Sequence, residues 1–136
     1  MINLFTYGSL MFEAVWSRVV SATCEKQQAR LTGYSRREVA GETYPALVPG
    51  SRHDRVDGMV YFDLREKDMA ALDRFEGDQY YRTREVCLLS DGRSMTAWVF
   101  IFKPEYGHRV KTSVWHPEQF AESGIVSFLS EYRGFG

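Results

Sequence analysis

Several features that would assign a protein to a particular class are missing from this chain of 136 residues. No apolar stretch approaches the roughly 20 residues of a membrane-spanning helix. Residues 1–5 carry no basic segment followed by a long apolar run, which is the pattern of a signal peptide. We therefore expect neither a membrane span nor a signal peptide, and we expect a cytoplasmic protein.

There is also no excess of charge of either sign. The 17 basic and 18 acidic residues leave a formal net charge of −1. Such a balanced chain has no field that would attract nucleic acid or anionic lipid, so we predict neither as a partner. The 44% hydrophobic and 26% charged content is typical of a globular protein. The 15% aromatic content suits a strand-rich core or a ligand cavity, and we expect a small-molecule ligand.

Metal-ligand patterns are absent as well. The two cysteines, Cys24 and Cys87, lie far apart, and we interpret them as free thiols, because nothing implies the oxidising compartment that a disulfide between them would need. His53, His108 and His116 fall in expected loops and form no ligand pair with one another or with the cysteines. No nucleotide-binding glycine loop occurs. We predict no metal and no cofactor.

The chain contains no repeat, low-complexity tract or linker, so we expect a single domain over residues 1–136. Strands are predicted at 1–7, 44–50, 56–64, 81–89 and 94–102, and a less certain extended segment at 28–40. The prolines of 44–50 favour an edge strand, and Asp91-Gly92 between two apolar runs predicts a hairpin. Period-two alternation predicts one inward face in the 56–64 segment, made by Val56, Gly58, Val60, Phe62 and Leu64.

Helices are predicted at 10–20, with Ser9 as the N-cap residue, at 65–75, with Gly77 ending the helix, and from Pro117 onward. The apolar face of the last helix would contain Phe120, Ala121, Ile125, Phe128, Leu129 and Tyr132. Because the middle strands are consecutive, the pattern favours an α+β fold over a doubly wound parallel sheet. We predict a mixed, barrel-like sheet of about six strands, flanked by two or three helices.

Glu76 is the most informative position. It shares one helical face with Met69 and Leu72, although Glu is rarely buried without a partner. It also lies at a helix C-terminus, where the dipole disfavours negative charge. Burial and dipole would both raise its pKa, which suits a general acid–base near neutral pH. The alternative is a glutamate that pairs with Arg82 or Arg84.

The segment Tyr7-Gly8-Ser9-Leu10 is the second candidate. A strand that ends in Gly-Ser before a helix leaves backbone N–H groups unpaired, and such a turn can bind a carboxylate or phosphate. The alternative is an ordinary capped helix start. The G-x-S-x-G pattern that would support Ser9 as a nucleophile is absent from the sequence. The segment 80–82 would place a phenol and a guanidinium beside Glu76, or it is an ordinary strand entry.

Together these motifs resemble the γ-glutamylcyclotransferase-like superfamily, in the branch of γ-glutamylamine cyclotransferases and plant avirulence-induced proteins. The matching motifs, in order over about residues 1–102, are Tyr7-Gly8-Ser9-Leu10, Tyr44-Pro45-Ala46, Val56-Asp57-Gly58-Met59-Val60-Tyr61, Leu72-Asp73-Arg74-Phe75-Glu76 and Tyr80-Tyr81-Arg82. Each motif is weak by itself. Their common order and spacing make the resemblance specific.

The resemblance implies a mixed barrel flanked by helices and a cyclisation that releases 5-oxoproline from a γ-glutamyl compound. It implies that Glu76 is the catalytic acid–base and that the 7–10 segment binds the γ-glutamyl group. From the matched motifs we also predict Tyr44, Ala46, Tyr80 and Arg82 as substrate-binding residues. The released amine stays unidentified. The alternatives are a non-catalytic binding or regulatory module on the same fold, and a related acyl-removing hydrolase.

Overall fold

Two β-sheets form the framework of the molecule in the computed structural model, which describes residues 2–21 and 23–131. The strands are β1 (Ile2–Thr6), β2 (Lys26–Thr32), β3 (Tyr34–Val39), β4 (Pro45–Pro49), β5 (Arg55–Leu64), β6 (Tyr80–Leu89), β7 (Ser94–Phe102) and β8 (Val110–Val114). Five of them close into a barrel in the order β1-β5-β2-β6-β7, and the other three form a sheet in the order β4-β3-β8. The predicted α+β fold with a barrel-like sheet is confirmed, with more strands than expected.

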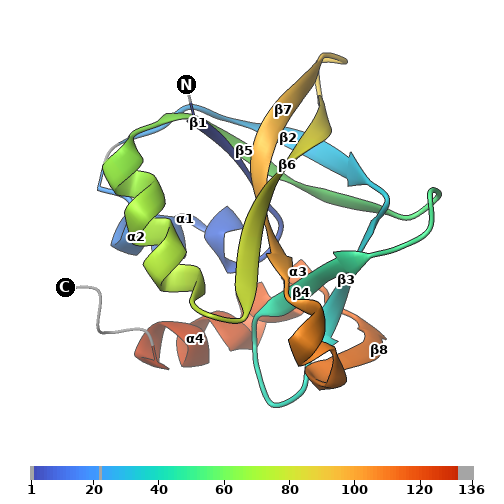
Figure 1. The fold of residues 1–136 in the computed structure, drawn as a ribbon. Helices are drawn as coiled ribbons and strands as arrows, with labels where there is room; N and C mark the ends of the chain where they lie inside the picture. Colours follow the sequence, from blue (N-terminus) through green and yellow to red (C-terminus); the bar gives the residue numbers. More distant parts are fainter. Residues whose placement is uncertain (1, 22, 132–136) are drawn as a thin grey trace.

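The helical segments lie around the barrel (Figure 1). They are η1 (Ser9–Met11), α1 (Glu13–Val19), α2 (Glu66–Glu76), η2 (Pro104–Arg109), α3 (Pro117–Gln119), η3 (Phe120–Gly124) and α4 (Ile125–Glu131). In Figure 1, α1 and α2 lie on one side of the barrel and α4 lies below them. Within the described residues, no helix has both the length and the apolar character needed to cross a membrane.

The barrel closes through a parallel pair. β1 pairs with β7 at Leu4 and Phe5, and it pairs antiparallel with β5 on its other side. Phe5, Val99 and Cys87 pack inside the barrel. Both cysteines are free thiols, as predicted, with Cys87 buried and Cys24 partly exposed. A second apolar cluster fills the space between the barrel and the helices.

The inward face predicted for β5 is correct for most of the strand and wrong at its end. Val60 and Phe62 pack in the barrel interior, whereas Leu64 packs on the helix side. The change follows from Asp63, whose φ of 58° breaks the alternation. Leu64 therefore contributes to the core beneath α1 and α2.

The helix predicted at 10–20 is interrupted, and Ser9 is not its N-cap residue. A 3₁₀ turn, η1, comes first, and α1 begins only after Phe12, which is extended at φ −94° and ψ 129°. Ser9 is the first residue of that turn, and the preceding Gly8 has no side chain with which to cap it. The Phe12 ring packs against Phe120 with 5.1 Å between centroids, which stabilises the break.

The last helix begins at Pro117, as predicted, but it contains a π-helical turn, η3. A π turn holds an extra residue, which shifts the side chains that follow relative to an α-helical pattern. Phe120 and Phe128 are buried as expected, but Ala121 is exposed and was wrongly assigned to the apolar face. Tyr132 lies outside the described residues.

Candidate active site

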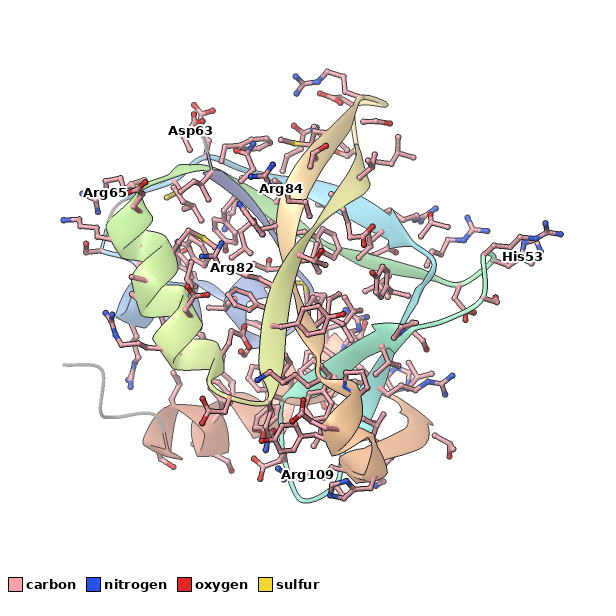
Figure 2. The ribbon with its side chains drawn as sticks, viewed as in Figure 1. His53, Asp63, Arg65, Arg82, Arg84 and Arg109 are labelled. Atoms are coloured by element: carbon pink, nitrogen blue, oxygen red, sulfur yellow. The ribbon has the colours of Figure 1, made fainter. Side chains whose placement is uncertain are left out.

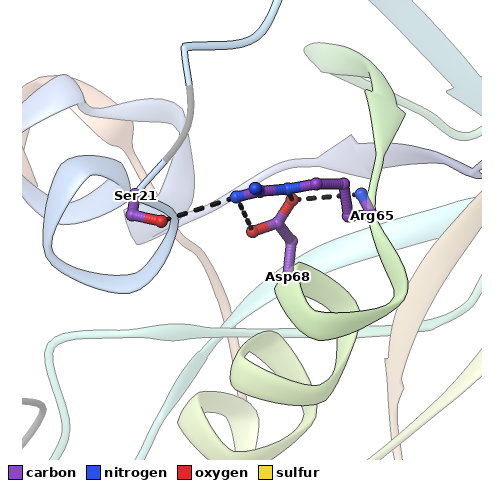
Figure 3. Close-up of polar contacts among 3 residues, drawn as sticks. All are labelled: Ser21, Arg65 and Asp68. Atoms are coloured by element: carbon purple, nitrogen blue, oxygen red, sulfur yellow. Dashed lines mark hydrogen bonds and ion pairs between the residues drawn. The ribbon is translucent and has the colours of Figure 1, made fainter.

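An ion pair between the half-exposed Arg65 and the buried Asp68 fixes the beginning of α2 (Figure 3). The Asp68 carboxylate accepts hydrogen bonds from the Arg65 backbone N–H at 3.0 Å and from the guanidinium Nε at 3.1 Å. Although burial raises the pKa of Asp68, these Arg65 donors together hold it below its ordinary value. The same guanidinium reaches the Ser21 hydroxyl at 3.5 Å. The contact ties α2 to the end of α1.

Glu76 is the last residue of α2. Met69 and Leu72, which precede it on the same face, are buried in the core below the helix. Gly77 ends the helix with a φ of 78°, and its N–H donates to the Asp73 carbonyl oxygen at 3.1 Å. Only glycine adopts this conformation without strain. The helix end thus holds the partly buried Glu76 at the margin of the apolar core.

Glu76 lines a small cavity between α2, the end of β1 and β4. Six residues predicted for substrate binding line the same cavity: Tyr7, Gly8, Ser9, Leu10, Tyr44 and Tyr80. The sequence analysis did not select Pro45 and Phe100, which also line it. Pro45 belongs to the quoted Tyr-Pro-Ala motif, and that motif could have indicated it. No motif in the sequence indicates Phe100, because it is one of several apolar residues in a long strand.

The environment of Glu76 disfavours its negative charge. Burial, and secondarily repulsion by Asp73, raises the pKa of its carboxyl from 4.5 to about 8. Within residues 2–21 and 23–131, no hydrogen bond or ion pair to this carboxylate is found. The alternative considered for Glu76, a pairing with Arg82 or Arg84, does not occur among these residues. Glu76 is thus able to take up and release a proton near neutral pH.

Two predicted substrate-binding residues lie elsewhere. Arg82 belongs to β6 and lies on the side of α2 (Figure 2). Its Nε donates to Asp73 Oδ1 at 2.9 Å, and its guanidinium lies 4.6 Å from the centre of the Trp98 ring. Arg84 stacks on the same indole at 4.8 Å. Ala46 is completely buried in a small cluster next to β7. Neither Arg82 nor Ala46 lines the cavity, because each side chain is held by other partners.

The 7–10 segment is held from both sides. The Tyr7 hydroxyl donates to the Phe100 carbonyl oxygen at 2.6 Å. Burial, and then the charge of Glu76, raises the pKa of this phenol well above its usual range, so it stays protonated. Arg36 Nη1 donates to the Tyr7 carbonyl oxygen at 2.8 Å. A Cβ on Gly8 would lie 2.8 Å from Pro45 Cγ, so this position accepts only glycine without rearrangement.

The amide groups of this segment are available to a ligand. Among the described residues, no backbone acceptor is found for the N–H of Ser9 or Leu10, because these residues open the short turn η1. The phenol of Tyr80 donates to the Pro45 carbonyl oxygen at 2.7 Å. The phenol of Tyr44 donates to Gln79 Oε1 at 3.2 Å. These contacts position both tyrosines in the cavity wall.

Other chemistry lacks support among the described residues. No histidine is among the described residues that line this cavity, so none of them gives Ser9 an imidazole base. No three His, Cys, Asp or Glu side chains come close enough together to hold a metal ion in the described part of the chain. A partly buried carboxylate beside free backbone amides is therefore the main chemical feature of the cavity.

Comparison with protein families identifies the family to which a chain with this fold and cavity belongs. Residues 4–117 match the family model "Gamma-glutamyl cyclotransferase, AIG2-like". The chain belongs to this family. The resemblance inferred from the motifs is confirmed, and the match extends past residue 102, where the motifs end.

Two members of the AIG2-like family in Arabidopsis thaliana show the extent of the similarity. AIG2-like protein D is 33% identical over 91 residues, which make up 67% of this chain and 59% of that protein. Protein AIG2 C is 27% identical over 129 residues, with 89% of this chain and 78% of that protein covered. The first match therefore spans less than two thirds of its relative.

Solved structures share the fold of this AIG2-like chain. A solution structure of an Arabidopsis thaliana protein has a TM-score of 0.70 at 24% identity, covering 97% of this chain and 88% of that one. A structure named gamma-glutamyl cyclotransferase has a TM-score of 0.65 at 16% identity, covering 75% and 66%. The barrel and its flanking helices are thus of the γ-glutamyl cyclotransferase type.

Proposed function

We propose that this AIG2-like protein is a γ-glutamyl cyclotransferase, which converts a γ-glutamyl amine into 5-oxoproline and a free amine. The observation that supports this most strongly is Glu76. Its carboxyl has a pKa near 8 and lines the same cavity as the free amides of Ser9 and Leu10. Family membership supports the same reaction class.

In the proposed reaction the substrate supplies its own nucleophile. Glu76 takes a proton from the α-ammonium group, and the resulting amine attacks the γ-carbonyl carbon. A carbon–nitrogen bond forms, closing a five-membered lactam, and the carbonyl oxygen becomes an oxyanion. When this intermediate collapses, the original γ-amide bond breaks, and Glu76 delivers the proton to the departing nitrogen. The attacking nitrogen also loses a second proton as the lactam forms, and the departing amine takes it up to become an ammonium ion, so two protons in all move from one nitrogen atom to the other.

The pKa of Glu76 suits this exchange. An α-amino group has an ordinary pKa of about 8, close to the value of about 8 for Glu76. Proton transfer between groups of matched pKa has little thermodynamic cost in either direction, and a placed acid–base contributes about 10²–10⁴-fold. An ordinary carboxylate with a pKa near 4 would be too weak a base for an ammonium group.

The 7–10 segment would bind the charged parts of the γ-glutamyl group. Backbone amides of Gly8, Ser9 and Leu10 are suited to the α-carboxylate or to the oxyanion, because preorganised donors stabilise negative charge in a water-poor site. Folding the chain so that amine and carbonyl meet in an attack geometry can contribute about 7–11 kcal/mol. Together with the acid–base, this suffices for an intramolecular reaction.

Glu76→Gln tests the proposal. We expect this variant to keep the fold but to lose turnover by about 10²-fold or more, because an amide neither accepts nor delivers the proton. Mass spectrometry would follow the products formed from γ-glutamyl-ε-lysine, γ-glutamyl amino acids, glutathione and γ-glutamylated polyamines. Glu66→Gln, at an exposed position on the same helix, is the matched control.

The products separate the competing functions. 5-Oxoproline from the native protein and from the control, but not from Glu76→Gln, supports the cyclotransferase. Free glutamate instead would identify an acyl-removing hydrolase. Binding of a γ-glutamyl compound without any product would identify a non-catalytic module, and full activity of Glu76→Gln would remove Glu76 from the mechanism.

A further inference from the structure

The Arg82 guanidinium is bound one helical turn away from Glu76, by a different carboxylate. Its Nε donates to Asp73 Oδ1 at 2.9 Å. Asp73 precedes Glu76 by three residues on α2, and residues with this spacing are neighbours on a helix surface, about 5–6 Å apart at Cβ. Tyr80, which shares a face of β6 with Arg82, lines the cavity of Glu76. Both elements therefore place the guanidinium within reach of Glu76.

A second contact holds Arg82 at this place. Its guanidinium lies 4.6 Å from the centre of the Trp98 ring, and the guanidinium of Arg84 lies 4.8 Å from the same ring. A guanidinium over an indole is attracted by the negative face of the ring. Trp98 packs in turn against the core below α2, which fixes the ring. Arg82 is thus held by a carboxylate of α2 and by an aromatic side chain of β7.

The described lining of the cavity supplies no cation of its own. It includes no lysine, arginine or histidine. Its titratable side chains besides Glu76 are the phenols of Tyr7, Tyr44 and Tyr80, and a phenol does not carry positive charge. A guanidinium brought to Glu76 would stabilise the carboxylate and make it a weaker base. The place where Arg82 is held therefore matters for the proposed acid–base.

We propose that Asp73 and Trp98 are positioning residues for the acid–base, because they hold Arg82 on the outside of the barrel and so leave Glu76 without a cationic partner. This inference rests on the proposed cyclotransferase function and adds the way in which its acid–base is kept active. It gives Arg82 a role other than the substrate binding that the motifs predicted for it.

The surroundings of the two carboxylates explain why Arg82 stays with Asp73. Both members of the Asp73–Arg82 pair are partly exposed, whereas Glu76 faces a small cavity at the margin of the core. Bringing the guanidinium to Glu76 would remove it from water, and that desolvation opposes the attraction between the charges. Without Asp73 this balance changes, because the carboxylates left at this end of α2 are Glu76 and the exposed Asp78.

Removal of the Asp73 carboxylate tests the proposal. In Asp73→Asn we expect the pKa of Glu76 to fall from about 8 to about 7 or below, because the released guanidinium pairs with it. In Asp73→Asn/Arg82→Gln the pKa of Glu76 should be higher than in Asp73→Asn by about 1 unit, since no guanidinium remains to pair with it. Arg82→Gln alone should keep this pKa at about 8 or above. Carbon-13 NMR of the glutamate carboxyl groups measures these values, with Glu76→Gln identifying the signal.

Arg74→Gln is the matched control, because it removes an arginine from an exposed position of the same helix. It should leave the titration of Glu76 as it is in the native protein. Equal Glu76 pKa values in Asp73→Asn and Asp73→Asn/Arg82→Gln would overturn the inference, because Arg82 would then not reach Glu76 when it is released. A lower pKa in Arg82→Gln alone would overturn it as well.

Trp98→Leu tests the second contact, because leucine keeps apolar volume at this position but offers no ring to the guanidinium. We expect the pKa of Glu76 to fall by less than in Asp73→Asn, since the hydrogen bond to Asp73 remains. Trp98→Leu/Arg82→Gln should show no such fall, because it has no guanidinium to release. An unchanged pKa in Trp98→Leu, or an equal fall in the double variant, would overturn the role of Trp98.

The titration needs no substrate, so this inference and the proposed function can fail separately. Where 5-oxoproline is formed, log(kcat/KM) should begin to rise at a lower pH in Asp73→Asn than in the native protein. The expected titrations without turnover of any γ-glutamyl compound would overturn the cyclotransferase and retain the positioning of Arg82. Turnover with the same titration and the same pH profile in the native protein and Asp73→Asn would overturn only the positioning. Neither a change in titration nor turnover would overturn both.

Discussion

At Glu76, the surroundings that disfavour a negative charge also suit the acid–base role that we propose for it. The residue lies at the margin of the apolar core, and the neighbouring Asp73 pairs with Arg82 at 2.9 Å. After burial, the charge of Asp73 is the second cause that raises the pKa of Glu76. The ion pair also keeps the Arg82 guanidinium away from Glu76. A guanidinium beside Glu76 would lower its pKa and weaken it as a base.

The raised pKa predicts how activity depends on pH. Glu76 must be deprotonated to accept the substrate's proton, so log(kcat/KM) should rise with pH and level off above about pH 8. The α-amine of the substrate titrates in the same pH range, so the pH profile by itself does not identify the group that titrates. Carbon-13 NMR of the glutamate carboxyl groups, with Glu76→Gln identifying the signal, should show one carboxyl that titrates near pH 8. A Glu76 signal that titrates near 4.5 would contradict this explanation.

The same shift predicts a pH-dependent stability. The unfolded chain releases the Glu76 proton near pH 4.5, whereas the folded protein keeps it up to about pH 8. Between these values the folded state binds more protons, so this group's contribution to the free energy of unfolding falls as pH rises. Glu76→Gln should therefore gain about 2–4 kcal/mol relative to the native protein between pH 5 and pH 8. Urea unfolding measures this gain, and Glu66→Gln should show none.

Residue patterns in the sequence predicted that Glu76 lies on a buried face, but not all of its surroundings. The stripe of Met69, Leu72 and Glu76 identified a carboxylate on a buried face, and the structure places it there. Sequence could not distinguish Asp73 from Glu76 as the partner of Arg82, because both lie at the end of α2. The choice depends on how β6 crosses that helix.

Among the elements, η1 and β4 depend on each other. Gly8 precedes η1, and its Cα lies so close to Pro45 of β4 that an added Cβ would meet two ring carbons at 2.8 and 2.9 Å. A proline ring is rigid, so either the turn or the strand must move to relieve the clash. This contact gives a structural reason why Gly8 and Pro45 both occur in the sequence motifs of the cavity.

Gly8→Ala should therefore weaken both stability and substrate binding. We expect a loss of about 1–3 kcal/mol in the free energy of unfolding, as for other overpacked positions. Displacement of the Ser9 and Leu10 amides should raise KM. Gly107→Ala is the control, because a Cβ there meets no atom within 4 Å. An unchanged KM in Gly8→Ala would argue against substrate contact with these amides.

Elements with strong periodicity were predictable and polar or irregular ones were not. α2 and the β6–β7 hairpin have clear apolar patterns with Gly77 and Gly92 at their ends, and both glycines have positive φ values. β8 was missed because nearly all of its residues are exposed, so no alternation marks it. The π turn η3 was missed because a single extra residue does not change the apolar pattern of a short helix enough to be recognised in the sequence.

For the whole molecule, the decisive feature is how the barrel and the three-stranded sheet are joined. Arg36 of β3 donates to the carbonyl oxygen of Tyr7 at 2.8 Å and to that of Asp57 at 3.3 Å. Its guanidinium also lies 5.2 Å from the centre of the Trp115 ring. One side chain therefore links the small sheet to the ends of β1 and β5. Sequence gives no sign of this contact or of barrel closure, because both join residues distant along the chain.

Arg36→Met tests whether this link supports the cavity. Burial lowers the pKa of Arg36, and loss of its donors would leave the Tyr7 carbonyl unpaired. We expect the free energy of unfolding to fall by about 2–4 kcal/mol, since hydrogen bonds from a charged donor contribute about 1.5–3 kcal/mol each. Hydrogen exchange of the Gly8 and Ser9 amides should become faster. Arg55→Met, at the exposed start of β5, is the control. If Arg36→Met and Arg55→Met have the same free energy of unfolding and the same amide exchange rates, the two sheets must hold the 7–10 segment through their apolar contacts instead.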